Sequence, residues 1–371
     1  MTQKGFLVLE DGTVYEGEPF GAPASATGEV VFSTSMTGYQ EALTDPSFAG
    51  QILVLTYPLA GNYGINKTDV ESNRIQVRGM VVREHCDMPS HWQSDMTLHE
   101  WLALHGIPGL SGIDTRALTR RLRISGVMMG VMSHGESPDE ALTYLRESPS
   151  YGDTDFVKEV SAARSYEWPN ESGRRPHIVL LDLGVKYNIM RILTAKGARV
   201  TAVPCLTPAE EILALKPDGF VVSPGPGDPA HLGYVVRTLK EMIGKTPILG
   251  ICLGHQTMGV AFGASTFKLK FGHRGANHPV RDLATGHVHI TAQNHGYAVD
   301  PNGLGGGIAV SHVNINDDTV EGLCHEEYGI QTIQYHSEAS PGPLDNIYFF
   351  DRFLETVTAR KKRRSGGAAR G

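Results

Sequence analysis

The chain has 371 residues, 40% of them hydrophobic and 20% charged, and a formal net charge of −7. Such a length suits two domains, each large enough to bury its own core. The acidic balance argues against general nucleic-acid binding, and no apolar run approaches the ~20 residues that a membrane helix needs. The opening stretch MTQKGFLVLEDG lacks the apolar centre of a secretory signal. We therefore expect a cytoplasmic protein that binds neither membrane nor nucleic acid.

The first part of the chain, residues 1–148, is predicted to be a strand-rich α+β domain. Short alternating or β-branched runs lie at residues 6–9, 30–32, 52–57 and 77–82, with turn residues between them. One helix is expected to begin after Asp114, a favourable N-cap, and to end at Arg123 before Gly126. Its apolar face would present Leu118 and Leu122, four residues apart.

The rest of the chain is predicted to be a linker and an α/β domain. Residues 149–176 are polar and broken by Pro, Gly, Asn and Ser, as in an interdomain connection. In residues 177–359, strand-like and helical runs alternate, which predicts a mostly parallel sheet flanked by helices. Within it, Thr207, Pro208 and Glu210 have the pattern of a capped helix start.

The last twelve residues, 360–371, begin with a dense basic run, which is followed by Ser, Gly and Ala residues. No aromatic residue interrupts the basic run, and the small residues beyond it cannot form a packed core. We expect this segment to be a solvated, disordered tail and not a nucleic-acid site.

A candidate nucleophile lies in the stretch TPILGICLGHQTMG. An apolar strand ends at Gly250, Cys252 follows, and a helix begins around Gly254. This is the pattern of a strand–turn–helix elbow, whose glycines permit a sharp turn and would leave the thiol exposed over the sheet edge. The first amides of the helix would face the sulfur and favour thiolate. The four cysteines are too scattered for a disulfide framework or a zinc site, so we expect no metal and assign the other three to packing.

A base for this cysteine is predicted at the end of the run GIQTIQYHSEAS. His336 closes a strand-like stretch and Glu338 follows two residues later, so both side chains can emerge at one sheet edge. A second loop, SPGPGDP at residues 223–229, follows another strand but lacks the Lys-Ser/Thr of a nucleotide-binding P-loop. One amide of this loop and the amide of Leu253 are candidates for an oxyanion hole.

Four motifs together resemble class I glutamine amidotransferase domains with a Cys-His-Glu triad. They are SPGPGDP, GICLGHQ, QNHGYAVD and QYHSE, in that family's order and spacing. The earlier segment FSTSMTGYQEALTDPSFAGQILVLTYPLAGNYG resembles the N-terminal domain of the carbamoyl-phosphate synthase small chain family. The combined resemblance extends from residue 5 to about residue 356.

This resemblance implies roles for individual residues. Cys252 would attack the side-chain carboxamide of L-glutamine, and Glu338 would orient His336. His336 would protonate the departing ammonia and then activate water against the thioester. The amides of Gly225 and Leu253 would form the oxyanion hole. The glutamine itself would be held by Ser47, Gly227, Gln256, Asn294, Gly296 and Tyr297.

The resemblance also implies a partner, the large subunit of carbamoyl-phosphate synthase. That subunit would make carbamoyl phosphate from bicarbonate, ammonia and two ATP for arginine and pyrimidine biosynthesis. This sequence has no ATP-binding signature, so we expect no cofactor in this chain and place ATP and Mg²⁺ on the large subunit. The expected assembly is a heterodimer, or a higher oligomer of heterodimers.

Three residues depart from the usual pattern of the family. Pro224 stands where asparagine is frequent, Tyr297 where phenylalanine is frequent, and Ser337 where proline is common. Serine leaves the turn between His336 and Glu338 freer than proline would. None of the three removes a reacting atom, so glutaminase chemistry is expected to survive.

Three other functions compete with this interpretation. The second domain alone would equally fit an amidotransferase that feeds another synthase, such as anthranilate synthase. A free-standing cysteine hydrolase of γ-glutamyl bonds would be fully active without a partner. A non-catalytic docking subunit would be expected to have lost its cysteine, and Cys252 is present.

Overall fold

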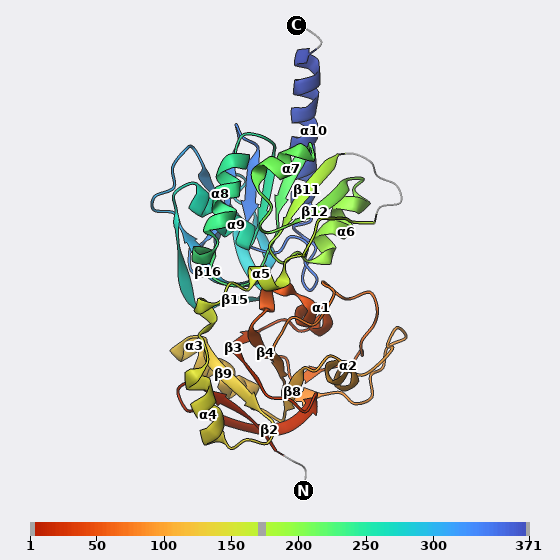
Figure 1. Cartoon of the computed structure of the whole chain (residues 1–371), viewed down its shortest axis with the longest axis vertical. Helices are drawn as coiled ribbons and strands as arrows, with labels where there is room; N and C mark the ends of the chain where they lie inside the picture. The colour runs from red at the N-terminus through yellow and green to blue at the C-terminus, as the bar shows by residue number, and fades with distance from the viewer. Residues whose placement is uncertain (1–3, 170–175, 369–371) are drawn as a thin grey trace. The chain divides into compact units, whose positions relative to one another are not determined.

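The computed structural model describes residues 4–169 and 176–368 (Figure 1). The chain divides into two compact units, each with its own core. Unit 1 contains the chain up to Phe156 together with Lys270–Gly275. Unit 2 contains Val157–Leu269 and the chain from Ala276 onward. No helix in the described part of the chain is both long and apolar enough to cross a membrane.

A closed barrel forms the centre of unit 1, which confirms the strand-rich prediction. Its strand order is β1-β2-β8-β6-β4-β3-β9 within the described residues, and β9 pairs with β1 to close it. The pairs β3–β4, β4–β6 and β6–β8 are parallel and the others antiparallel. The strands are β1 Gly5–Leu9, β2 Val14–Gly21, β3 Ala26–Ser33, β4 Gln51–Leu55, β6 Gly79–Val81, β8 Pro108–Ser111 and β9 Met128–Ser133.

The barrel strands alternate between two hydrophobic cores. In β4, Ile52 and Val54 join a cluster that also takes side chains from β1, β3, β6, β8 and β9. Because one face of each of these strands supplies this cluster, it fills the barrel interior. Leu53 and Leu55, on the other face of β4, pack in a second cluster outside the barrel. A period of two therefore places the apolar side chains of this strand alternately in the two cores.

Short helices cover the barrel. The predicted helix is confirmed as α3, Thr115–Ser125, where Asp114 caps the Ala117 amide at 2.9 Å and Gly126 follows the last turn. Both α2 and α4 begin with capping boxes, in which a hydroxyl and a glutamate satisfy the first free amides. The remaining bounds are α1 Tyr39–Thr44, η1 Pro46–Phe48, β5 Leu59–Ala60, β7 Glu84–His85, α2 Leu98–Leu104, α4 Pro138–Glu147 and η2 Tyr151–Asp153.

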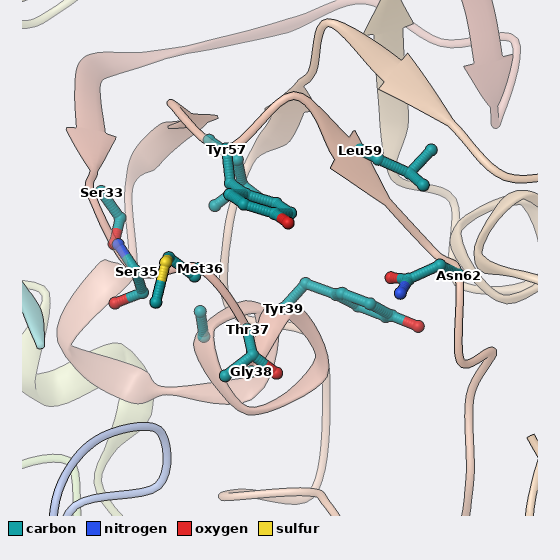
Figure 2. A pocket seen from close by; sticks show the side chains of 11 residues that line it. Ser33, Ser35, Met36, Thr37, Gly38, Tyr39, Tyr57, Leu59 and Asn62 are labelled. Carbon is teal, nitrogen blue, oxygen red and sulfur yellow. The ribbon is translucent and has the colours of Figure 1, made fainter.

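Unit 1 contains a small hollow (Figure 2). One side is lined by residues that lead into and belong to α1, and the other by residues around β5. The lining residues are Ser33, Ser35, Met36, Thr37, Gly38, Tyr39 and Ala42 on the first side and Leu55, Tyr57, Leu59 and Asn62 on the second. Figure 2 shows Tyr57 across the hollow from Met36 and Thr37, with Tyr39 below it. None of the predicted catalytic or glutamine-binding residues lines this hollow.

The sheet of unit 2 has a parallel centre with antiparallel edges. Its order is β10-β12-β11-β13-β14-β19-β18-β16-β15-β17 within the described residues. The run from β12 to β19 is parallel, and β10 and β18 add antiparallel strands at its two ends. The strands are β10 Tyr166–Glu167, β11 His177–Asp182, β12 Arg199–Pro204, β13 Gly219–Val222, β14 Ile248–Ile251, β15 Ser265–Asp282, β16 Val288–Asp300, β17 Ala309–Asn314, β18 Val320–His325 and β19 Ile330–Ile333.

Helices cover both faces of this sheet, as predicted. In β11, Ile178 and Leu180 pack on one core together with α6 and α10, whereas Val179 and Leu181 pack on another with α7, α8 and α9. Strands buried on both faces are typical of parallel sheets. The helices are α5 Val157–Val160, α6 Tyr187–Ala195, α7 Ala209–Ala214, α8 Gly233–Met242, α9 Leu253–Ala261 and α10 Tyr348–Ala368, with η3 at Pro229–His231.

Two predictions about the connecting and terminal segments differ from the structure. The expected linker, 149–176, is divided between the units at Phe156, and β10 within it pairs with β12; residues 170–175 lie outside the described part. The expected disordered tail, 360–371, begins inside α10, which continues through Ala368. Arg360 donates to the Tyr328 and Gly244 carbonyls at 2.7 and 2.6 Å. These contacts hold the start of the basic run on unit 2; residues 369–371 are not described.

Candidate active site

Cys252 lies between the last residue of β14 and the first residue of α9, as the elbow pattern predicted. Its backbone φ is 52°, a left-handed conformation that costs a non-glycine residue about 1–3 kcal/mol. The Cys252 amide donates to the Ile333 carbonyl at 2.8 Å, and its own carbonyl accepts from the Gln256 amide at 3.0 Å. The strained residue is thus tied to β19 on one side and to the helix on the other.

The two glycines of the elbow serve a different purpose from the one predicted. Cys252 itself takes the left-handed turn, and neither Gly250 nor Gly254 has a positive φ. A Cβ at Gly254 would lie 2.3 Å from the Val222 carbonyl oxygen, and one at Gly250 would lie 2.8 Å from the Gly254 oxygen. Glycine is therefore required because α9 packs directly against the ends of β13 and β14.

The thiol of Cys252 is buried, so the expectation of an exposed thiol is wrong. The residue is only 2% exposed and belongs to a hydrophobic core cluster. Besides His336, described below, polar groups contact the sulfur at two points: the Asn294 carbonyl accepts from Sγ at 3.7 Å, and the Gln334 side-chain amide donates to Sγ at 3.5 Å. The candidate nucleophile is thus buried in an apolar core but has polar groups in contact with its sulfur.

His336 and Glu338 lie together immediately after β19. His336 Nδ1 is 2.5 Å from Glu338 Oε1, and the His336 amide donates to the Ala292 carbonyl at 2.9 Å. Burial alone would lower the pKa of His336, but the Glu338 carboxylate and the Cys252 sulfur outweigh it and raise that pKa. The imidazole also interacts with the Cys252 side chain. The ring therefore has one nitrogen oriented by a carboxylate and faces the Cys252 thiol, with which it can exchange a proton.

Lys186 is a site residue that the sequence analysis missed. Its Nζ lies 3.3 Å from Glu338 Oε1 and donates to the Ala339 carbonyl at 2.5 Å, with both charged side chains almost fully buried. Burial alone would raise the pKa of Glu338, but His336 and Lys186 outweigh it and lower that pKa. Asn188 donates to the Glu338 carbonyl at 2.5 Å. The available signal was a lysine just after β11, at the edge where parallel strands end.

The proposed oxyanion-hole residues are neighbours. A Cβ at Gly225 would lie 2.1 Å from the Leu183 carbonyl oxygen and 2.9 Å from Leu253 Cδ2, so the loop after β13 passes directly over the start of α9. Gly227, in the same loop, has a φ of 93°, which favours glycine. The loop that was predicted to supply an amide is therefore adjacent to the elbow.

The predicted glutamine-binding residues divide between the two units. Gln256 Nε2 donates to the Tyr297 carbonyl at 2.7 Å, which joins α9 to β16. Asn294, Gly296 and Tyr297 lie on β16, and the Asn294 carbonyl contacts the nucleophile. Ser47 belongs to unit 1, in η1, where it is 6% exposed and its hydroxyl has no hydrogen-bond partner among the described residues.

The serine that replaces the family's usual proline is fully buried. Ser337 is 0% exposed, and its hydroxyl has no partner in the described part of the chain. His336 on one side is held by the Ala292 carbonyl, and the Ala339 amide donates back to the His336 carbonyl at 3.1 Å. These backbone contacts orient the turn without a proline.

Comparison with known proteins agrees with this architecture. Residues 179–356 match the family "Glutamine amidotransferase class-I", and residues 7–132 match "Carbamoyl-phosphate synthase small chain, CPSase domain". The carbamoyl phosphate synthase small chain of Listeria innocua is 49% identical over 360 residues, covering 97% of this chain and 98% of the relative. That of Methanopyrus kandleri is 51% identical over 354 residues, covering 94% and 97%.

The doubly covered sheet and the cysteine elbow, together with the family match of this half, define unit 2 as a class I glutamine amidotransferase domain. Unit 1 carries the more specific information, because its barrel matches a domain described for one synthase. The whole chain belongs to the carbamoyl phosphate synthase small chain family.

Proposed function

We propose that this chain is the glutamine-hydrolysing subunit of a carbamoyl-phosphate synthase and that Cys252, His336 and Glu338 form its catalytic triad. His336 takes the thiol proton, and Sγ attacks the carboxamide carbon of glutamine. The C–N bond breaks as His336 returns the proton to the departing ammonia. His336 then deprotonates water, which hydrolyses the thioester to glutamate and regenerates the thiol.

Glu338 and Lys186 act on this cycle through His336. The carboxylate at 2.5 Å holds the imidazole in one orientation and stabilises its protonated form. Lys186 balances the carboxylate's charge, since a buried unpaired anion is strongly destabilising. Glu338 and Lys186 therefore keep each other ionised although both side chains are buried.

The remaining predicted residues bind the substrate in this proposal. The amides of Gly225 and Leu253 stabilise the tetrahedral oxyanion, supported by the close approach of their two segments. Ser47, Gly227, Gln256, Asn294, Gly296 and Tyr297 bind the rest of the glutamine.

We propose that the ammonia passes to a large partner subunit, as the names of the relatives imply for this chain. The partner makes carbamoyl phosphate for arginine and pyrimidine biosynthesis and binds the ATP and Mg²⁺. This chain then needs no cofactor or metal of its own. A heterodimer in the cytoplasm, where ATP and bicarbonate are at hand, is the proposed working form.

The observation that carries the proposal is the Cys252 elbow with His336 paired to Glu338 at 2.5 Å, and the test is ammonia release from glutamine. The chain is assayed alone and with the matching large subunit, as wild type and as Cys252→Ser. We expect low activity alone, strong stimulation by the partner, and loss of activity in the variant. Full activity without the partner would favour a free-standing hydrolase, and an active Cys252→Ser variant would refute the mechanism.

A further inference from the structure

Gln334 contacts the nucleophile but has no role in the mechanism so far. It is 0% exposed, and its backbone amide donates to the Glu321 carbonyl at 2.8 Å, which anchors the residue between β19 and His336. Its side-chain Nε2 lies 3.5 Å from Cys252 Sγ, within the range of a hydrogen bond to sulfur. A buried amide that donates to a reacting sulfur is placed to act on that sulfur's charge.

A chain of amides fixes which end of Gln334 faces the sulfur. The Tyr297 carbonyl can only accept, so the group of Gln256 that meets it at 2.7 Å must be the Nε2 donor. The same Nε2 donates its second hydrogen to Gln334 Oε1 at 3.0 Å. Gln334 therefore has its oxygen toward Gln256 and its NH₂ toward Cys252. Flipping either amide would bring two donors or two acceptors face to face.

The backbone groups around the sulfur do not stabilise its anion, so besides the imidazolium of His336, which interacts with Cys252 as a charged group, the site needs a neutral donor. The Asn294 carbonyl, 3.7 Å away, accepts from the neutral thiol and would repel a thiolate. The Cys252 amide is already bonded to the Ile333 carbonyl. Gln334 Nε2 is thus the neutral side-chain donor available to Sγ within the described site, and a hydrogen bond from it strengthens when the acceptor becomes charged.

We propose that Gln334 is a further catalytic residue, which donates a hydrogen bond to the Cys252 thiolate and to the same sulfur when it leaves the thioester. Gln256 is the positioning residue that orients it from the Tyr297 carbonyl. We call this hydrogen-bonded series, from the Tyr297 carbonyl through Gln256 and Gln334 to Cys252, the amide relay. The amide relay rests on the proposed function, because it takes Cys252 as the nucleophile.

The amide relay is tested by the pH profile of Cys252 alkylation with iodoacetamide in the absence of glutamine. The modified Cys252 peptide is quantified by mass spectrometry, so that reaction at the other three cysteines does not enter. Gln334→Met keeps much of the side chain's length and removes the donor, and Gln334→Leu is a second variant in case one packs poorly. Thermal unfolding of each variant shows that it is folded.

We expect the midpoint of the alkylation profile to rise by about 1–2 pH units in both Gln334 variants, the equivalent of one lost hydrogen bond to a charged group. The matched control is Gln331→Met, on β19 three residues before Gln334, where the side chain bonds Thr356 at 3.1 Å and does not contact the sulfur. Its profile should equal that of the wild type. Coinciding profiles for wild type and both Gln334 variants would overturn the proposal.

A double-mutant cycle tests the orienting role of Gln256. Gln256→Leu alone should raise the alkylation midpoint, and in the Gln334→Met background it should raise it no further. Fully additive shifts would overturn the amide relay. Because no glutamine is present, these outcomes are independent of substrate binding. A failure of the proposed function would show separately, as ammonia release by Cys252→Ser.

Discussion

Replacing Gly254 with alanine should damage the candidate active site by displacing α9, the helix that begins directly after Cys252, the proposed nucleophile. The new Cβ would lie 2.3 Å from the Val222 carbonyl oxygen, whereas ordinary contacts begin near 3.4 Å, so α9 or β13 must move by roughly 1 Å. Both partners are backbone, and no side-chain rotation can relieve the overlap. Overpacking of this kind costs about 1–3 kcal/mol of unfolding free energy.

The catalytic effect of Gly254→Ala should exceed its effect on stability. The displaced segment carries Leu253, whose amide is the proposed oxyanion donor. A misplacement of about 1 Å costs on the order of 100-fold in rate. We therefore expect kcat/KM for glutamine to fall about 100-fold while the protein stays folded.

The assays are ammonia release in the complex and urea unfolding of the isolated chain, with Gly233→Ala as the matched control. Gly233 opens α8, and an added Cβ there would meet nothing within 4 Å. Alanine should be neutral or stabilising at that position, by up to about 1 kcal/mol. Gly254→Ala with the activity and urea midpoint of the wild type would refute the packing argument.

Three further predictions concern buried polar groups. Lys186→Met should lower the unfolding free energy by about 3 kcal/mol, because Glu338 loses a buried cation. Glu338→Gln in that background should recover part of the loss in urea unfolding; strictly additive costs would contradict the pairing. Ser337→Pro should change glutaminase activity only slightly, because the triad is already oriented; a vastly more active variant would show the native triad to be poorly formed. His255 is buried, which lowers its pKa from 6.5 to about 3. As the pH falls, the His255 imidazole is therefore protonated in the unfolded chain before it is protonated in the folded chain. The free energy of unfolding consequently decreases below pH 6.5. The free energy of unfolding is measured by urea titration between pH 6 and 4 for the wild type and for His255→Leu. The variant should lose about 1.4 kcal/mol less per pH unit than the wild type. Parallel curves of unfolding free energy against pH would contradict the prediction.

Local sequence patterns predicted the elements that depend on neighbouring residues. The Asp114 cap, the Leu118/Leu122 spacing and Gly126 delimited α3 almost to the residue. The alternation of apolar runs after residue 177 predicted strands covered on both faces. A G-x-C-x-G pattern after an apolar run placed Cys252 at a strand end, because the turn is built from consecutive residues.

Other local patterns were overridden by their surroundings. Thr207 has the sequence context of a helix cap, yet α7 begins at Ala209 with Pro208 as N-cap and no side-chain capping bond. The basic segment from Arg360 has the composition of a tail, yet carbonyls of two distant loops accept from its first arginine and the helix continues. At Arg360 tertiary contacts outweigh a weak local preference, whereas no contact in the structure explains why Thr207 does not cap α7.

The sequence by itself determined the class of fold, the elbow and the pairing of His336 with Glu338, since each depends on residues close together in the chain. Only the tertiary structure decided that the thiol is buried, that Lys186 balances Glu338 and that Gln334 faces the sulfur. Gln334 is 82 residues from Cys252 in sequence, and the two meet because β19 pairs with β14 in a specific register. Contacts of that kind follow from strand order and register, which the chain settles only when the whole sheet assembles.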